Sequence, residues 1–335
     1  MNESFRLRQR EVFEVLSIIA KRAEQEGELL IFIGGSAVQM VLKEPKRLSI
    51  DLDILYSGNV EELLVVLEGY YGLIKRETVF GEIFSFYKAV KDEVEVKIDI
   101  IRIKKGDYGG MYGPRKIKVD GKMFEVNAGT AEFLLASKIA ALGIGTIGRK
   151  RDRDSFQSDL LKDVFDSISL IDEFGINDAV WGYFSYLSRF ENKLKKTSFT
   201  EMQAIESAIS ALRKSTQLND EDPYLTKGSF GEFQQYQFAN LLNLGGYWVM
   251  AYRLSAYLGA LSTAKDKDLP AYIGRIDQFV KSNEKDTKLF IEIEKKLAGY
   301  GISKDHLHEL KIIRPDAFLY LYLSFEPNHL ENIKT

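Results

Sequence analysis

The residues best suited to chemistry lie in one stretch, Leu29 to Leu55. Asp51 and Asp53 stand two positions apart in a strand-like segment, 50–55. Side chains two apart on a strand point to the same face, so the two carboxylates share one face. Two carboxylates held this close repel each other unless a divalent cation lies between them. The spacing therefore predicts a magnesium site at this strand.

A glycine turn precedes that strand. The apolar run 29–33 has the length of a strand and ends in Gly34-Gly35-Ser36. A short helix is predicted over 37–43, and its free N–H groups would face whatever lies over Gly35 and Ser36. Glycine permits a close approach, and a helix N-terminus favours an anion. The pattern predicts that Gly35 and Ser36 bind phosphate groups of a nucleotide.

A third carboxylate, Asp99, lies on a later predicted strand, 94–103, in which apolar and polar residues alternate. Asp51, Asp53 and Asp99 are therefore predicted as ligands of one or two Mg²⁺ ions, which would neutralise a triphosphate and its leaving pyrophosphate. The alternative is structural. Asp51 and Asp53 could lie on a solvated edge strand and protect it from aggregation.

Composition indicates the class of protein. The chain has 335 residues, a hydrophobic fraction of 45%, a net charge of -3 and no cysteine. Disulfides, thiolate zinc sites and cysteine nucleophiles are excluded. The most apolar late stretch, 241–261, contains Arg253 and two glycines, which is typical of buried helices and not of a membrane span. These properties predict a cytoplasmic protein without a membrane partner.

The order of elements predicts an α+β fold. A helix is predicted over 4–26 and another over 60–71, with hairpin turns at 91–93 and at Asp120-Gly121. Helical periodicity dominates from residue 130 onward, and aromatic stretches such as 318–322 have the spacing of helix cores. We expect a catalytic domain over 1–175 and an all-helical domain over 176–335.

Four motifs together resemble the AbiEii/AbiGii toxin family of nucleotidyltransferases, also called the MenT-like group. Gly34-Gly35-Ser36 with the following segment 47–53 resembles its signature. The segments 97–100, 138–142 and 162–166 resemble its second, its helical lysine and its closing motifs, in the right order. The resemblance covers about residues 29 to 172, and the remainder of the chain resembles no family.

The resemblance implies a polymerase β-like nucleotidyltransferase core with a mixed sheet, which moves a nucleoside monophosphate from an NTP to an acceptor with Mg²⁺. Members of the family are toxins of toxin–antitoxin systems, and some add nucleotides to the 3′ end of tRNA. It thus implies tRNA as acceptor and a cognate antitoxin as partner.

The resemblance also implies roles for individual residues. Asp51 and Asp53 would be catalytic metal ligands. Lys138 would contact the triphosphate, and Asp163 would complete the catalytic set. Arg47 and Ser49 would order the aspartate strand or contact phosphate.

Alternatives remain open. Lys138 could be a surface lysine with its stem on apolar neighbours. Asp163 and Asp166 could lie on a solvated helix face beside Lys162. The acceptor could be a hydroxyl of a protein or of a small molecule such as an aminoglycoside, since fold does not decide function. The chain could also be a silent scaffold that binds a nucleotide or a partner protein.

A further motif, Gly143 to Gly148, matches the dinucleotide-binding pattern G-x-G-x-x-G. That pattern requires a strand before it and a helix after it, whereas a helix is predicted before this one. We expect a flexible loop instead, leading to the basic cluster 149–153. That cluster would bind an RNA acceptor or the NTP, or would simply be solvated.

Overall fold

The computed structural model describes residues 3–81, 83–106, 108–151, 155–217, 224–235, 237, 242–263 and 268–331. The chain forms two compact units. The first contains residues 1–134 and 235–240, and the second contains residues 135–234 and 241–335. The helices that carry Lys138 and Asp163 thus belong to the second unit, whereas the predicted catalytic domain extends to residue 175.

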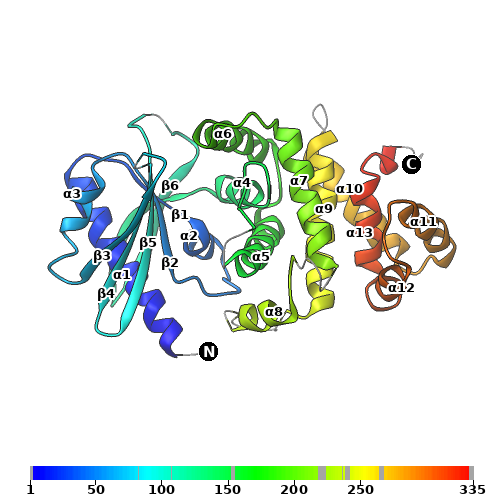
Figure 1. The fold of residues 1–335 in the computed structure, drawn as a ribbon, viewed down its shortest axis with the longest axis horizontal. Coiled ribbons are helices and arrows are strands. Elements are labelled where there is room, and N and C mark those ends of the chain that lie inside the picture. The colour runs from blue at the N-terminus through cyan, green and yellow to red at the C-terminus, as the bar shows by residue number, and fades with distance from the viewer. Residues whose placement is uncertain are drawn as a thin grey trace. The chain divides into compact units, whose positions relative to one another are not determined.

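The first unit is built on a mixed sheet (Figure 1). Among the described residues it has seven strands in the order β3 (Gly72–Val79), β4 (Phe84–Lys91), β5 (Val94–Arg102), β2 (Asp51–Tyr56), β1 (Leu30–Ile33), β7 (Lys122–Gly129) and β6 (Tyr112–Val119). The central pairs β2·β5 and β1·β7 are parallel, and the other pairs are antiparallel. The mixed sheet followed by helices confirms the α+β class.

One face of this sheet packs on α1 (Glu3–Gln25), whose apolar residues Val12, Leu16 and Ile19 are fully buried. Alternate residues of β2 and β5, including Leu52 and Ile98, are buried as well. The residues between them must point to the opposite face, because side chains alternate along a strand. The core of this unit therefore fixes which face carries the aspartates.

Both predicted hairpins are present, and the turn at Asp120-Gly121 has the positive φ values expected of it, 48° and 81°. Two expectations need correction. The helix predicted over 60–71 is shorter, α3 (Val60–Val65), and it is followed by β3, which the pattern did not predict. β3 is a mostly exposed edge strand, so it lacks the alternation of buried residues that marks a strand in sequence.

The helix after the glycine turn also begins earlier than expected. α2 spans Gly34–Val41, so Gly35 and Ser36 lie in its first turn and not before it. Gly34 makes this possible because it has a φ of 73°, which glycine adopts without steric cost. The chain later returns to this region, where Gln237 forms an isolated antiparallel bridge with Arg47.

The second unit is helical. After α4 (Ala131–Ala141), which starts in the first unit, it contains α5 (Phe156–Phe174), α6 (Asp178–Lys195), α7 (Glu201–Thr216), α8 (Lys227–Gln234), α9 (Leu244–Thr263), α10 (Leu269–Asn283), α11 (Thr287–Gly299), α12 (Lys304–Ile313), α13 (Pro315–Phe325) and a short 3-10 turn, His329–Glu331. Its core includes α9 and α13, and the aromatic stretch 318–322 is buried as predicted. Within the described part of the chain, no helix has the length and apolarity needed to cross a bilayer.

Gly34 and Gly27 form a matched pair for a test of the glycine turn. Both have positive φ, 73° and 65°, but a Cβ at Gly34 would lie 1.9 Å from Asp53 Oδ2, whereas a Cβ at Gly27 would meet nothing within 4 Å. We expect Gly27→Ala to cost about 1 kcal/mol from backbone strain alone. Gly34→Ala should cost about 2–5 kcal/mol, because overpacking is added to strain. Urea denaturation measures both, and equal losses would contradict the close approach of Asp53 to Gly34.

Candidate functional site

The predicted carboxylates gather on one face of the first unit's sheet. β2 and β5 are parallel neighbours, and their register places Asp53 directly opposite Asp99. Asp51 lies two residues earlier on β2, on the same face, and is half-buried like the other two. The three carboxylates predicted from the sequence thus belong to adjacent strands and share one face.

The glycine turn lies against these carboxylates. Gly34 follows Ile33, which pairs with Asp53 on the neighbouring strand. A Cβ on Gly34 would overlap the Asp53 carboxylate, as the distance of 1.9 Å to Oδ2 shows. A Cβ on Gly35 would lie 2.7 Å from Arg47 Nη2 and 2.8 Å from Ser49 Oγ. The absence of a side chain at Gly34 therefore leaves room for the Asp53 carboxylate. The absence of one at Gly35 leaves room for the Arg47 guanidinium and the Ser49 hydroxyl.

The side chain of Ser36 does not have the free hydroxyl expected of a phosphate ligand. Its side chain is buried, and its Oγ donates a hydrogen bond of 2.7 Å to the carbonyl of Asp51. The hydroxyl hydrogen is thus committed to the backbone of β2. In this arrangement Ser36 ties α2 to the aspartate strand. The donors left at the start of α2 are its backbone N–H groups, which receive no side-chain cap from Ile33.

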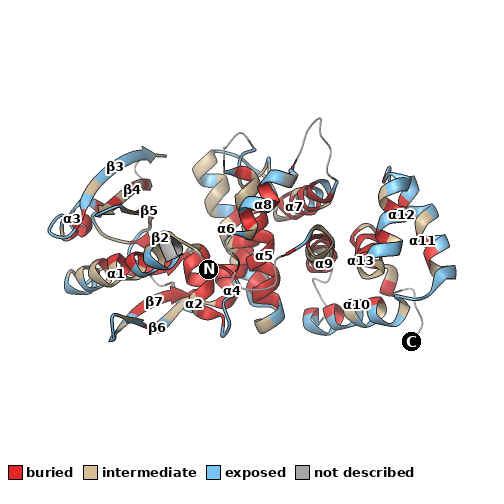
Figure 2. Cartoon of the chain, turned by 90° about the horizontal axis from the view of Figure 1, so that it is seen from below, coloured by how far each residue is buried: buried red, intermediate tan, exposed pale blue. Residues whose placement is uncertain are grey.

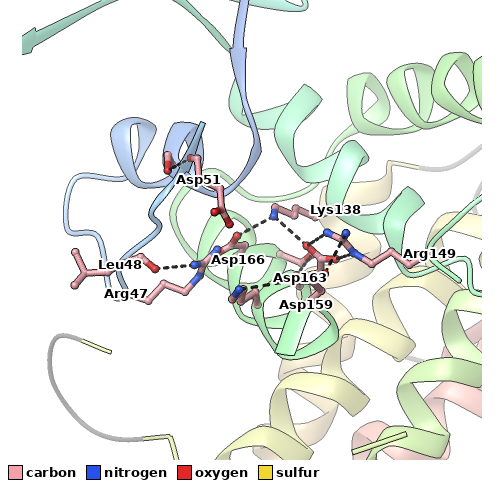
Figure 3. A network of polar contacts seen from close by, with 11 residues as sticks. Arg47, Leu48, Asp51, Lys138, Arg149, Asp159, Asp163 and Asp166 are labelled. Carbon is pink, nitrogen blue, oxygen red and sulfur yellow. Dashed lines mark hydrogen bonds and ion pairs between the residues drawn. The ribbon is translucent and has the colours of Figure 1, made fainter. Parts of the chain in front are cut away.

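Arg47 and Ser49 precede the aspartate strand and lie beside Gly35. Arg47 is only 3% exposed, and its Nη1 donates to the carbonyl of Leu48 at 2.8 Å (Figure 3). A buried guanidinium next to a helix N-terminus makes the surroundings of Gly35 electropositive. The four residues predicted to bind nucleotide in this segment, Gly35, Ser36, Arg47 and Ser49, are therefore brought together.

The acids fit Mg²⁺ by their chemistry, although they do not enclose an ion alone. Within the described ranges, no three Asp, Glu or His side chains are arranged as a metal-binding group. Mg²⁺ usually keeps several waters and is bound through one or two carboxylates together with substrate phosphates. Asp53 and Asp99, directly opposite each other on adjacent strands, match that requirement.

A second cluster lies in the second unit, between α4 and α5. Lys138 Nζ contacts Asp163 Oδ1 at 3.0 Å and Asp166 Oδ2 at 3.1 Å (Figure 3). Figure 2 shows α5 buried along most of its length, and both acids are among its buried residues. The alternatives of a surface lysine and of a solvated helix face are therefore wrong for Lys138, Asp163 and Asp166.

Arg149 completes this cluster. Its Nε contacts Asp163 Oδ2 at 2.8 Å, and its Nη1 lies 3.5 Å from Asp159 Oδ2. Burial alone would raise the pKa of Asp163, but the charges of Arg149 and Lys138 outweigh it and lower the pKa to about 2. The carboxylate is therefore ionised at neutral pH. It holds two cations in place, and the sequence alone did not assign this role to Arg149.

The loop before Arg149 is held in place and not free. Gly148 N–H donates to the carbonyl of Gly143 at 2.8 Å, and Lys195 Nζ donates to the carbonyl of Gly148 at 2.9 Å. The preceding element is the helix α4, so the dinucleotide pattern lacks its strand. Of the basic cluster, Arg149 is committed to Asp163, and Arg151 lies 4.2 Å from the ring of Tyr224. The last two residues of the cluster, 152 and 153, lie outside the described residues.

Comparisons with known proteins give limited information. No family model and no curated protein matches the chain. Among solved structures, an antigenic nucleotidyltransferase-like protein from Paracoccidioides brasiliensis is similar, with 15% identity, coverage of 56% of this chain and 91% of that chain, and a TM-score of 0.33.

Two structures of the antibiotic-resistance factor ANT(2'')-Ia are also similar. The solution structure has 14% identity, coverage of 56% and 95%, and a TM-score of 0.37. The crystal structure with adenylyl-2''-tobramycin has 15% identity, coverage of 54% and 98%, and a TM-score of 0.36. These names are all of nucleotidyltransferases or proteins like them. Scores this low carry no functional assignment, and the resemblance to the AbiEii/AbiGii family stays a prediction.

Asp163→Asn tests the buried cluster. Removal of this charge takes their shared partner from the buried Lys138 and the half-buried Arg149, which should lower the free energy of unfolding by about 3 kcal/mol at pH 7. Because the folded pKa of about 2 lies below the unfolded value, the contribution of Asp163 is full above about pH 4 and is lost as the pH falls toward 2. Urea denaturation across this range measures the difference.

Asp159→Asn is the matched control for that experiment. It lies one turn earlier on α5, and its ion pairs are longer, 3.5 Å to Arg149 and 3.7 Å to Lys162. We expect a loss of about 1 kcal/mol or less. If Asp163→Asn were as mild as this control at pH 7, the buried ion network would not have the arrangement described.

Proposed function

We propose that this chain is a magnesium-dependent nucleotidyltransferase that moves a nucleoside monophosphate from an NTP to an acceptor hydroxyl. The observation that carries the proposal is the pairing of β2 with β5, which sets Asp53 opposite Asp99 while Gly34 touches the Asp53 carboxylate. Carboxylates of this kind beside a helix N-terminus suit the transfer of a phosphoryl group, which requires positioning and charge neutralisation more than covalent chemistry.

Each residue beside the aspartate strand has a role in this proposal. Asp53 and Asp99 would hold Mg²⁺ together with phosphates of the substrate, with Asp51 beside them on the same face, and the ion would neutralise the phosphates and the developing charge. The backbone N–H groups at Gly35 and the Arg47 guanidinium would bind the triphosphate, with Ser49 beside them. Ser36 would position the aspartate strand through its hydrogen bond to Asp51.

In the transfer step, the acceptor oxygen bonds to the α-phosphorus of the NTP. The bond from that phosphorus to the oxygen bridging to the β-phosphate breaks, and pyrophosphate leaves. The acceptor hydroxyl gives up its proton to Asp99, which passes it to solvent. We assign this role to Asp99 because β5 lies on the side of β2 away from Gly34.

The roles of Lys138 and Asp163 are part of the proposal. Lys138 as a triphosphate ligand would have to exchange contacts with Asp163 and Asp166 for contacts with phosphate. A lysine already surrounded by carboxylates is held charged and in a defined rotamer, which suits a ligand of an anion. Asp163 would keep the catalytic role that the family resemblance implies for it, and would hold Lys138 in place.

The finer assignment concerns the acceptor and the biological role. From the family resemblance we propose tRNA as the acceptor, action as a toxin of a toxin–antitoxin system, and a cognate antitoxin as partner. A protein or small-molecule hydroxyl is the second acceptor class. The alternative outside the enzymes is a scaffold that binds a nucleotide or a partner protein without turnover.

The experiment is incubation of the purified protein with each labelled NTP in turn, Mg²⁺ and total tRNA. We expect label on the RNA for the preferred NTP, and a loss of at least about a thousandfold in rate for Asp53→Asn, because one metal-binding carboxylate is neutralised. Chelation of Mg²⁺ should abolish transfer in the wild type as well.

Asp172→Asn is a control for charge removal, since Asp172 belongs to the helical unit and pairs there with Arg253. It should label like the wild type. Equal labelling by Asp53→Asn would refute the assigned acids. Label on the protein itself without tRNA would support the second acceptor class, and no NTP binding in calorimetry with Mg²⁺ would refute nucleotide transfer altogether.

A further inference from the structure

The aspartate face of the sheet carries more than acids. Three strands align side chains in register on this one face, since residues paired across neighbouring strands point the same way. The rows across β4, β5 and β2 are Phe84–Ile101–Leu55, then Phe86–Asp99–Asp53, then Lys88–Lys97–Asp51. Two aromatic rings, three acids and two lysines therefore share this face within a single unit.

The two phenylalanines of β4 are not part of the core beneath the sheet. On the same strand, Ser85, Tyr87 and Ala89 are the buried residues, whereas Phe84 and Phe86 are half-buried on the opposite face. Phe84 has an edge contact with Phe80, at 6.0 Å between centroids. Phe86 lies directly opposite Asp99, the acid that faces β4. An aromatic ring beside a metal-binding acid can stack on a nucleobase.

The strand order separates this ring from the phosphate side of the site. β1 and the glycine turn border β2 on one edge, and β5 followed by β4 borders it on the other. In phosphoryl transfer the attacking and leaving oxygens are roughly in line. If pyrophosphate leaves toward Gly35, the acceptor must approach from β5 and β4. Phe86 therefore lies on the acceptor side and not on the triphosphate side.

A lysine on this face can bind an anionic group of the acceptor. Lys97 is exposed, lies opposite both Asp51 and Lys88, and also acts by its charge on Glu95. Lys88 is paired with Glu95 at 2.6 Å. An exposed lysine beside the acids can contact a phosphate of an acceptor nucleotide. The ring and the lysine together match one nucleotide, its base and its phosphate.

We infer that the β4–β5 face is the acceptor site for the 3′-terminal nucleotide of an RNA, with its base stacked on Phe86 and its phosphate held by Lys97. Neighbouring strands lie about 4.8 Å apart, so Phe86 is about 10 Å across the sheet from Asp53. That span is within the size of one nucleotide, so the terminal hydroxyl can reach the acids while the base contacts the ring. This inference rests on the proposed function and adds the residues that would bind the RNA acceptor.

Acceptor binding and turnover are measured separately in the test. Binding of dye-labelled tRNA, and of a short single-stranded RNA with a free 3′-hydroxyl, is followed by fluorescence anisotropy with Mg²⁺ and no NTP. We expect Phe86→Ala to weaken binding by about tenfold or more, because the stacking of one base is lost, and Phe86→Tyr to restore it. Lys97→Gln should reduce the dependence of log affinity on log salt by about 0.7.

In the labelling assay, Phe86→Ala should raise the KM for RNA by a similar factor and leave the KM for NTP within about twofold. Ile74→Ala is the matched control, because Ile74 is 53% exposed on the same face, opposite Lys88 but one strand further from the acids. It should change neither constant. An increase of the KM for NTP equal to that for RNA would place Phe86 on the nucleotide side and overturn the inference.

The outcomes separate this inference from the proposed function. Wild-type protein that transfers label to tRNA while Phe86→Ala binds and labels RNA normally overturns only the acceptor site. Wild-type protein that binds no RNA but labels an aminoglycoside also overturns it and keeps the transferase. Absence of transfer to every acceptor, with RNA binding still lost in Phe86→Ala, overturns the transferase and supports the RNA site.

Discussion

The approach of Gly34 to the carboxylate of Asp53 is the constraint on which the first unit depends. A side chain on Gly34 would occupy the space of Asp53 Oδ2, so only glycine allows the end of β1 to pass there. Because β1 pairs with β2 on that side and β2 pairs with β5 on the other, the same contact aligns the start of α2, Asp53 and Asp99. The positions of the acids are thus fixed by backbone pairing in rigid strands and not by flexible side chains.

In the second unit, the charged side chains are paired with one another in a buried cluster. Lys138, Arg149, Asp163 and Asp166 are gathered where α4 and α5 pack, and the two acids are almost completely buried. Buried ions are costly unless each is paired, and an ion network that is completely paired fixes the rotamers of all its members. Such a network stabilises little compared with apolar packing. It does define the direction of each charge.

Local pattern was enough to predict much of this protein. The alternation in 94–103 placed Asp99 opposite the core residues of its strand, and the positive φ of Asp120-Gly121 followed from turn chemistry. Pairing between distant strands was not predictable, so the register of Asp53 with Asp99 and of Phe86 with Asp99 came only from the structure. β3 was missed because an exposed edge strand shows no apolar alternation. The partners of Lys138 and Arg149 were missed as ion pairs because they are 25 and 14 residues away in sequence.

The bridge between Arg47 and Gln237 has a consequence for the nascent chain. Arg47 lies at the entry to the aspartate strand, but its backbone partner is made about 190 residues later, after about half of the helical unit has been synthesised. Closing so long a loop is slow compared with the local hairpins of the sheet. The guanidinium beside the glycine turn is therefore secured late in biosynthesis. A truncated product that ends before residue 237 would contain all three aspartates and still lack this backbone pairing.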